Sequence, residues 1–125
     1  MEMKIEELSC SIIITTYNSS ETIIATLNSI ISQINSRDEL LIYDDCSQDE
    51  TFSMLNTFFK DKTFKFKLKR SKHNNGGPAK GRNWGIEMAQ GQYICFCDAD
   101  DTWLPNKLLT QIAFLQGSQY DFCGT

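Results

Sequence analysis

The sequence has little proline and glycine, no excess of basic charge and no long apolar run. Two prolines and seven glycines among 125 residues exclude collagen-like and low-complexity chains. With 12 basic and 16 acidic side chains, the net charge of −4 argues against a dedicated nucleic-acid binder, which needs a basic surface. The apolar runs, such as YICFC at 93–97, are far shorter than the ~20 residues of a membrane-spanning helix.

The N-terminus and the cysteines narrow the class of protein further. Residues 1–7 alternate charged with apolar side chains, so no signal peptide is indicated, and we expect a cytoplasmic domain. Five cysteines without regular spacing do not form a disulfide framework, and a single histidine argues against zinc. We therefore expect reduced thiols that pack as small hydrophobic side chains.

Strand-like and helix-like segments alternate along the chain. Strands are predicted at 9–16, 39–43 and 93–97 as buried runs and at 64–70 as a half-exposed or edge strand with outward lysines. One more strand is predicted to begin at 120–123. Apolar residues at helical spacing predict helices after Ser19 or Ser20, which would cap the first, and at 47–59, 79–89 and 105–115. This order predicts an α/β fold, a doubly wound, mostly parallel sheet flanked by helices, in one domain spanning 1–125.

Ligands of such sheets bind beyond the carboxyl ends of the strands. Asp98, Asp100 and Asp101 follow the run at 93–97, which we expect at the centre of the sheet. Two carboxylates ~4 Å apart repel by roughly 4 kcal/mol at an effective dielectric constant near 20, and a divalent cation would offset this cost. Oxygen ligands in this pattern favour Mg²⁺ or Mn²⁺. The alternative is a solvated turn in which Asp101 or Thr102 caps the next helix.

Two further strand ends carry candidate ligands for a nucleotide. Of Asp44 and Asp45, one could cap a helix beginning near Ser47, and the other could accept a hydrogen bond from a base or ribose. Tyr17 offers an aromatic face on which a base could stack, or it covers the edge of the sheet.

The segment NNGGPAKGR at 74–82 places glycines and two cations, Lys80 and Arg82, at the start of a helix. Free N–H groups at a helix N-terminus favour phosphates, although these cations could equally pair with the aspartates. Neither a Walker A loop nor G-x-G-x-x-G is present, so a nicotinamide or flavin cofactor is not indicated.

Together these segments resemble the nucleotide-binding part of glycosyltransferase family 2, an inverting group with the GT-A fold. The matching segments are SIIITTYN at 11–18, LLIYDDCSQDET at 40–51, NNGGPAKGRNWGIEMAQGQYICFCDADD at 74–101 and LPNKL at 104–108. The resemblance implies a nucleoside-diphosphate sugar donor, usually a uridine one, and a Mn²⁺ or Mg²⁺ ion. It implies nucleotide-binding roles for Thr15, Tyr17, Asn18, Asp45, Arg82 and Asp98, and a metal-binding role for Asp100.

The resemblance also sets expectations for the whole protein. The catalytic base and the acceptor site of the family lie downstream of the matching part, so we expect the base beyond Thr125 and an inactive fragment. The acceptor stays open between a glycan, a lipid and a protein, and synthesis of a bacterial surface polysaccharide is the expected pathway. Peripheral membrane association of a longer parent and self-association are further expectations, and nucleic acid is not an expected partner. The alternatives are a non-catalytic nucleotide-sugar-binding module and a receiver-like signalling domain.

Overall fold

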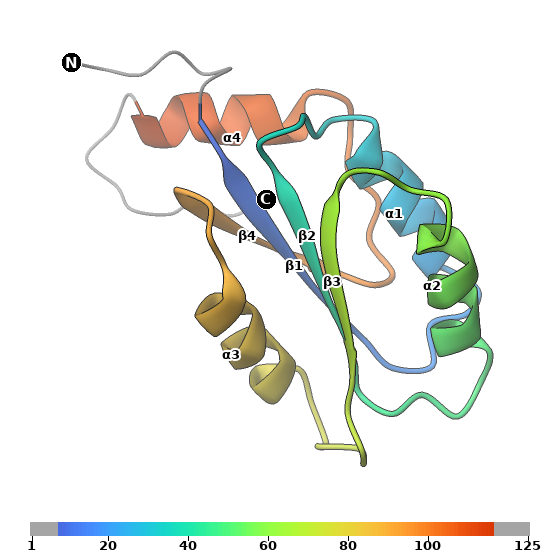
Figure 1. Cartoon of the computed structure of the whole chain (residues 1–125). Coiled ribbons are helices and arrows are strands. Elements are labelled where there is room, and N and C mark those ends of the chain that lie inside the picture. Colours follow the sequence, from blue (N-terminus) through green and yellow to red (C-terminus); the bar gives the residue numbers. More distant parts are fainter. Residues whose placement is uncertain (1–7, 117–125) are drawn as a thin grey trace.

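The computed structural model describes residues 8–116, which form a parallel β-sheet with helices on both faces (Figure 1). Within this range the sheet has four strands in the order β3-β2-β1-β4. Their bounds are Cys10–Thr16 for β1, Glu39–Asp44 for β2, Lys65–Arg70 for β3 and Tyr93–Asp98 for β4. The predicted α/β class and parallel sheet are confirmed.

The helices divide between the two faces of the sheet. Helices α1 (Ile23–Ile31) and α2 (Thr51–Phe59) cover one face, and α3 (Ala79–Met88) covers the other (Figure 1). Helix α4 (Lys107–Gln116) lies near the starts of β1 and β2. Each helix connects two successive strands or follows the last one, which is the arrangement that parallel pairing requires.

The main hydrophobic core lies between the sheet and helices α1, α2 and α4. Ile12 and Ile14 of β1 face it and are fully buried, in register with Leu40 and Ile42 of β2. Leu27 of α1 packs into the same cluster. A β-branched strand buried on both faces is typical of a parallel sheet, and it places β1 at the middle of the fold.

Helix α3 reaches the opposite face through two glycines one helical turn apart. A Cβ atom at Gly85 would lie 2.6 Å from Ile13 Cγ2, and one at Gly81 would lie 2.7 Å from Thr15 Cγ2. Such distances are shorter than van der Waals contact, so only glycine allows the helix to lie this close to β1 and β2.

The prediction that residues 93–97 form a buried strand at the centre of the sheet is wrong for the described residues. Strand β4 is at the edge of the four-stranded sheet, and Ile94 and Phe96 are 42% and 46% exposed. Helix α3 packs mainly against β1 and β2, and it reaches this face of β4 through Arg82, whose Cζ lies 5.7 Å from the centroid of the Phe96 ring. The strand expected at 120–123 lies outside the described residues.

The caps predicted from sequence are also wrong. Helix α1 begins at Ile23, and the carbonyl oxygen of Ser19 accepts its N–H, while the Ser20 N–H donates to Asp49. Helix α4 begins only at Lys107, so Asp101 and Thr102 precede it by at least a turn. In this protein the polar residues that follow a strand form a loop before the helix begins. A polar residue ahead of an apolar helical pattern is compatible with either a loop or an N-cap, so the sequence does not separate the two.

The described cysteines are unbridged, as expected. The sulfur atoms of Cys10 and Cys95, on neighbouring strands, lie 2.8 Å apart. This hydrogen bond and burial raise the pKa of the Cys10 thiol, and burial raises the pKa of Cys97 to about 11. Cys10 and Cys97 therefore stay protonated near neutral pH and pack as apolar groups.

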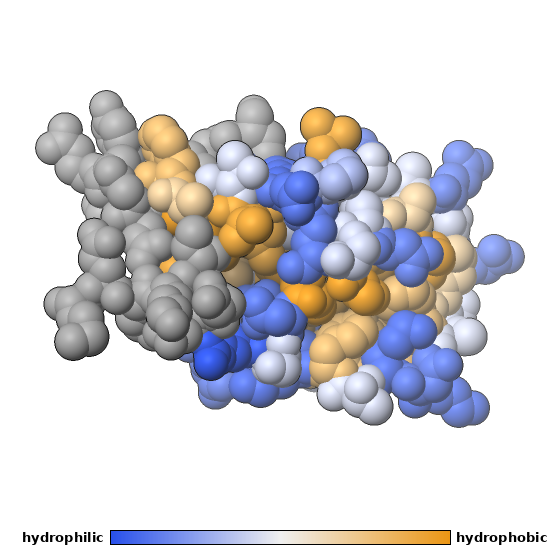
Figure 2. All heavy atoms as spheres, turned by 90° about the horizontal axis from the view of Figure 1, so that it is seen from above, coloured by the Kyte–Doolittle hydropathy of each residue, from blue (hydrophilic) through white to orange (hydrophobic). Residues whose placement is uncertain are grey.

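One side of helix α4 faces away from the core. Figure 2 views the molecule from above and shows hydrophobic residues at the surface between hydrophilic ones. On α4 and the segment before it, Leu104, Leu109 and Phe114 are 77%, 51% and 51% exposed. No helix within residues 8–116 has the length and apolar character needed to cross a bilayer.

Candidate functional site

The carboxyl ends of β1, β2 and β4 lie level with one another, where the sequence predicted a site. Thr15 of β1 is in register with both Tyr43 of β2 and Asp98 of β4. Two neighbouring pockets open there, and Thr15 and Tyr17 line both. The predicted residues thus divide between two adjoining spaces along one edge of the sheet.

The first pocket has a volume of about 390 Å³ and lies between the ends of β1 and β2 and the start of α3. Its lining comprises Thr15, Thr16, Tyr17, Tyr43, Asp45, Asn74, Gly76, Gly77, Pro78 and Gly81. Tyr17 is 44% exposed, so its ring is accessible to a ligand. The pocket combines an aromatic wall with one carboxylate, which suits a flat polar ring such as a nucleobase.

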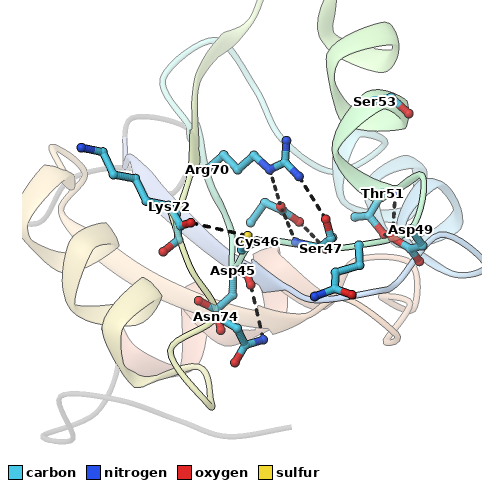
Figure 3. Close-up of polar contacts among 12 residues, drawn as sticks. Asp45, Cys46, Ser47, Asp49, Thr51, Ser53, Arg70, Lys72 and Asn74 are labelled. Carbon is cyan, nitrogen blue, oxygen red and sulfur yellow. Dashed lines mark hydrogen bonds and ion pairs between the residues drawn. The ribbon is translucent and has the colours of Figure 1, made fainter.

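The two adjacent aspartates after β2 have different roles. Asp44 is fully buried and accepts hydrogen bonds from the Ser47 N–H (3.0 Å) and the Ser47 hydroxyl (2.5 Å). Arg70 Nε lies 3.7 Å from Asp44 Oδ2, and Arg70 Nη2 donates to the Ser47 carbonyl oxygen (Figure 3). Asp44 therefore fixes the turn that follows β2. It does not cap a helix near Ser47, as one of the two aspartates was expected to do, because α2 begins only at Thr51 and has no side-chain cap.

Asp45, by contrast, lines the first pocket. Its carboxylate accepts hydrogen bonds from Asn75. Its carbonyl oxygen lies 3.5 Å from Asn74 Nδ2 (Figure 3). Gly76, with φ of 82°, turns the loop back toward the start of α3. Sequence analysis missed Asn75 and Tyr43, which contact each other beside Asp45. Asn75 was one polar residue of the loop HNNGGP, and Tyr43 was one apolar residue of the predicted strand at 39–43.

The second pocket, about 650 Å³, lies on the other side of Tyr17. Its lining includes Asn18, Asp98 and Asp100, three of the residues predicted to bind nucleotide or metal. The Asn18 side-chain oxygen accepts the N–H of Gln48 at 2.8 Å, so Asn18 also joins the loops that follow β1 and β2. Its φ of 48° is a conformation that asparagine tolerates better than most residues.

The three aspartates after β4 converge. One carboxylate oxygen each of Asp98, Asp100 and Asp101 lies within 4.8 Å of the others, and all three residues are exposed. Arg82 Nη2 of α3 lies 3.3 Å from Asp98 Oδ1, so this cation pairs with the cluster, which was the alternative to a role in phosphate binding. Hard oxygen donors at this spacing fit Mg²⁺ or Mn²⁺. Solvent screening weakens the repulsion among exposed carboxylates, so the cluster is also stable without an ion.

Comparison with known proteins points to one family. The family model described as glycosyl transferase family 2 matches residues 11–125. An Escherichia coli protein, UDP-Glc:alpha-D-GlcNAc-diphosphoundecaprenol beta-1,3-glucosyltransferase WfaP, is 37% identical over 112 residues, covering 90% of this chain and 43% of the relative. The putative teichuronic acid biosynthesis glycosyltransferase TuaG of Bacillus subtilis is 36% identical over 107 residues, covering 84% of this chain and 41% of the relative.

Solved structures that are similar to this chain are also glycosyltransferases. The structure of Staphylococcus aureus TarS residues 1–349 in complex with UDP-GlcNAc matches with a TM-score of 0.77 at 32% identity, over 86% of this chain and 31% of that one. A mannosyltransferase from Pyrobaculum calidifontis shares the fold, with a TM-score of 0.80 at 23% identity over 88% of this chain and 32% of that one. The chain thus spans less than half the length of these relatives.

Proposed function

Because the chain belongs to glycosyl transferase family 2, we propose that it binds the nucleoside-diphosphate sugar donor of a glycosyltransferase, most simply a UDP-sugar. One observation carries the proposal. The Asp45 pocket and the aspartate cluster lie on either side of Tyr17 and Thr15, so a single ligand could place its base in one and its diphosphate at the other. The structure of a relative with UDP-GlcNAc supports this donor class.

In this proposal each strand end contributes to one part of the donor. Tyr17 and Thr15 frame the base, and Asp45 accepts a hydrogen bond from a ring N–H. Asp98 accepts from the ribose, and Arg82, already beside Asp98, meets the diphosphate. Asn18 holds the loop that carries Tyr17, through its bond to Gln48.

The metal is proposed for Asp100, assisted by its neighbours in the cluster. A bound Mn²⁺ or Mg²⁺ supplies a Lewis acid that stabilises the charge of the departing diphosphate. The chain's own contribution is to hold carboxylates at the end of β4, level with the base pocket, and to keep Arg82 on the phosphate side. Inversion then needs a general base to take the proton of the acceptor hydroxyl, which we propose lies in the parent beyond Thr125.

For the longer parent we propose sugar transfer in bacterial surface polysaccharide synthesis, which is supported by the names of WfaP and TuaG. The named acceptor of WfaP is a diphosphoundecaprenol-linked sugar. A lipid-linked acceptor of this kind would bring the parent to the cytoplasmic face of a membrane.

Calorimetric titration of UDP into the 125-residue chain, in Mn²⁺ and in EDTA, tests the proposal. We expect binding in Mn²⁺ that weakens strongly in EDTA, and we expect Asp100→Ala to remove most of that difference. Asp98→Asn should weaken binding less, because an amide still hydrogen-bonds to ribose. Equal affinity in Mn²⁺ and EDTA would refute the metal assignment, and no binding in either would refute the donor site itself.

A further inference from the structure

The carboxylate of Asp45 is held from one side by a single residue of the loop between β3 and α3. The Asn75 backbone N–H lies 3.0 Å from Asp45 Oδ1 and 3.1 Å from Oδ2, and Asn75 Nδ2 donates to Oδ1 at 2.7 Å. Asp45 itself is only 6% exposed. A buried carboxylate with charge-assisted hydrogen bonds from backbone and side chain of one residue has little freedom to rotate.

The Asn75 amide is in turn oriented by its surroundings. The Ser71 hydroxyl donates to the His73 carbonyl oxygen at 2.6 Å, so a lone pair of Ser71 Oγ is left to accept from Asn75 Nδ2 at 3.0 Å. An amide nitrogen carries two protons, and its shortest contacts, Asp45 Oδ1 and Ser71 Oγ, take one each. The Asn75 oxygen therefore points away from Asp45, and the amide acts toward that carboxylate only as a donor.

The count of donors singles out one oxygen of Asp45. Oδ1 accepts hydrogen bonds from both the backbone N–H and the side-chain amide of Asn75. Oδ2 accepts only from the backbone N–H, which is shared between the two oxygens and lies slightly farther from Oδ2. Each carboxylate oxygen has about two acceptor positions, so Oδ2 keeps one for a ligand in the pocket that Asp45 lines. Because the groups that hold Asp45 are all donors, its free oxygen is presented as an acceptor, which suits a uracil ring N–H and opposes cytosine, whose corresponding ring nitrogen is itself an acceptor.

From this geometry we infer that Asn75 is a positioning residue for base selection, which presents Asp45 Oδ2 to the base and sets the preference for UDP over CDP. The inference rests on the proposed donor site. Asn75→Asp would place a second carboxylate at the 2.7 Å contact, and two carboxylates at such a distance share a proton or turn apart. A protonated Asp45 would donate rather than accept, and a rotated one would leave the pocket.

The experiment titrates UDP, CDP and inorganic diphosphate into the 125-residue chain in Mn²⁺ by calorimetry. We expect Asn75→Asp to lower UDP affinity roughly 10- to 100-fold, to lower CDP affinity less, and to leave diphosphate affinity unchanged. Asn75→Ala, which keeps the backbone N–H, should cost roughly 3- to 10-fold for UDP. Asn56→Asp on the exposed surface of α2 makes the same change in charge and should alter none of the three affinities.

The outcomes separate this inference from the proposal beneath it. If the unmodified chain binds diphosphate but not UDP, the donor site fails, and the inference fails with it. If Asp45→Ala loses UDP affinity while both Asn75 variants keep it, Asn75 does not position Asp45 and only the inference is overturned. Equal losses for UDP, CDP and diphosphate in Asn75→Asp would assign Asn75 a structural role, because base selection requires the ratio of UDP to CDP affinity to fall.

Discussion

The close approach of α3 to the sheet depends on Gly85, and replacing it with alanine should destabilise the protein. The added Cβ would lie 2.6, 2.7 and 2.8 Å from three carbon atoms of Ile13, which is 1% exposed and sits on the middle strand β1. Because Ile13 is buried on an inner strand of the sheet, we expect the overpacking penalty to be near the upper end of about 1–3 kcal/mol. Alanine recovers about 1 kcal/mol of helix propensity over glycine. We therefore expect a net loss of about 2 kcal/mol in the free energy of unfolding.

Urea unfolding measures this loss, and Gly77→Ala is the matched control. A Cβ at Gly77 meets nothing within 4 Å, so the same change there should stabilise the protein by about 0.4–1 kcal/mol through the unfolded state. Gly81→Ala contacts Thr15 and Tyr43, which line the base pocket, so it alone of the two helical variants should also weaken UDP binding. The reasoning is refuted if Gly85→Ala is as stable as Gly77→Ala.

Two further predictions concern acid stability and catalysis. Although desolvation acts in the opposite direction, hydrogen bonds from Thr51 and Ser20 lower the pKa of the exposed Asp49 carboxyl to about 2. The stabilising effect of the ionised Asp49 should be complete above about pH 4 and be lost as the pH falls toward 2. Urea unfolding at pH 4.5 and 2.5 should therefore show a smaller decrease in the free energy of unfolding for Asp49→Asn than for the unmodified chain. The surface variant Asp61→Asn, which removes an equal charge, serves as the control, and identical losses in all three proteins would contradict the role of Asp49. In a product assay with several UDP-sugars, the 125-residue chain should transfer sugar ~10²- to 10⁴-fold more slowly than a longer parent that contains the base. Comparable rates would place the base within residues 1–125.

The sequence alone determined the order of elements and the edge at which the site lies. The β-branched run of β1 and the alternation of β3 are local patterns, because side chains on a strand repeat every two residues. Parallel strands separated by helices bring all carboxyl ends to one edge of the sheet, so the sequence alone groups Tyr17, Asp45 and Asp98 at that edge. The family resemblance rested on the same residues, and the match over 11–125 confirmed it.

The tertiary structure decided which of two similar residues does what, because that depends on partners distant in sequence. Asp44 and Asp45 are adjacent and chemically identical. Arg70 and Ser47 contact the buried Asp44, whereas Asn75 contacts Asp45 at the wall of the pocket. Gly85 is a glycine because of Ile13, more than seventy residues earlier in the chain. The apolar side chains of β4 predict a buried strand, but its place at the edge of the described sheet depends on its pairing with β1, which the sequence pattern does not specify. The hydrophobic periodicity of the sequence indicates which side chains face the interior, whereas tertiary packing determines which residues they contact there.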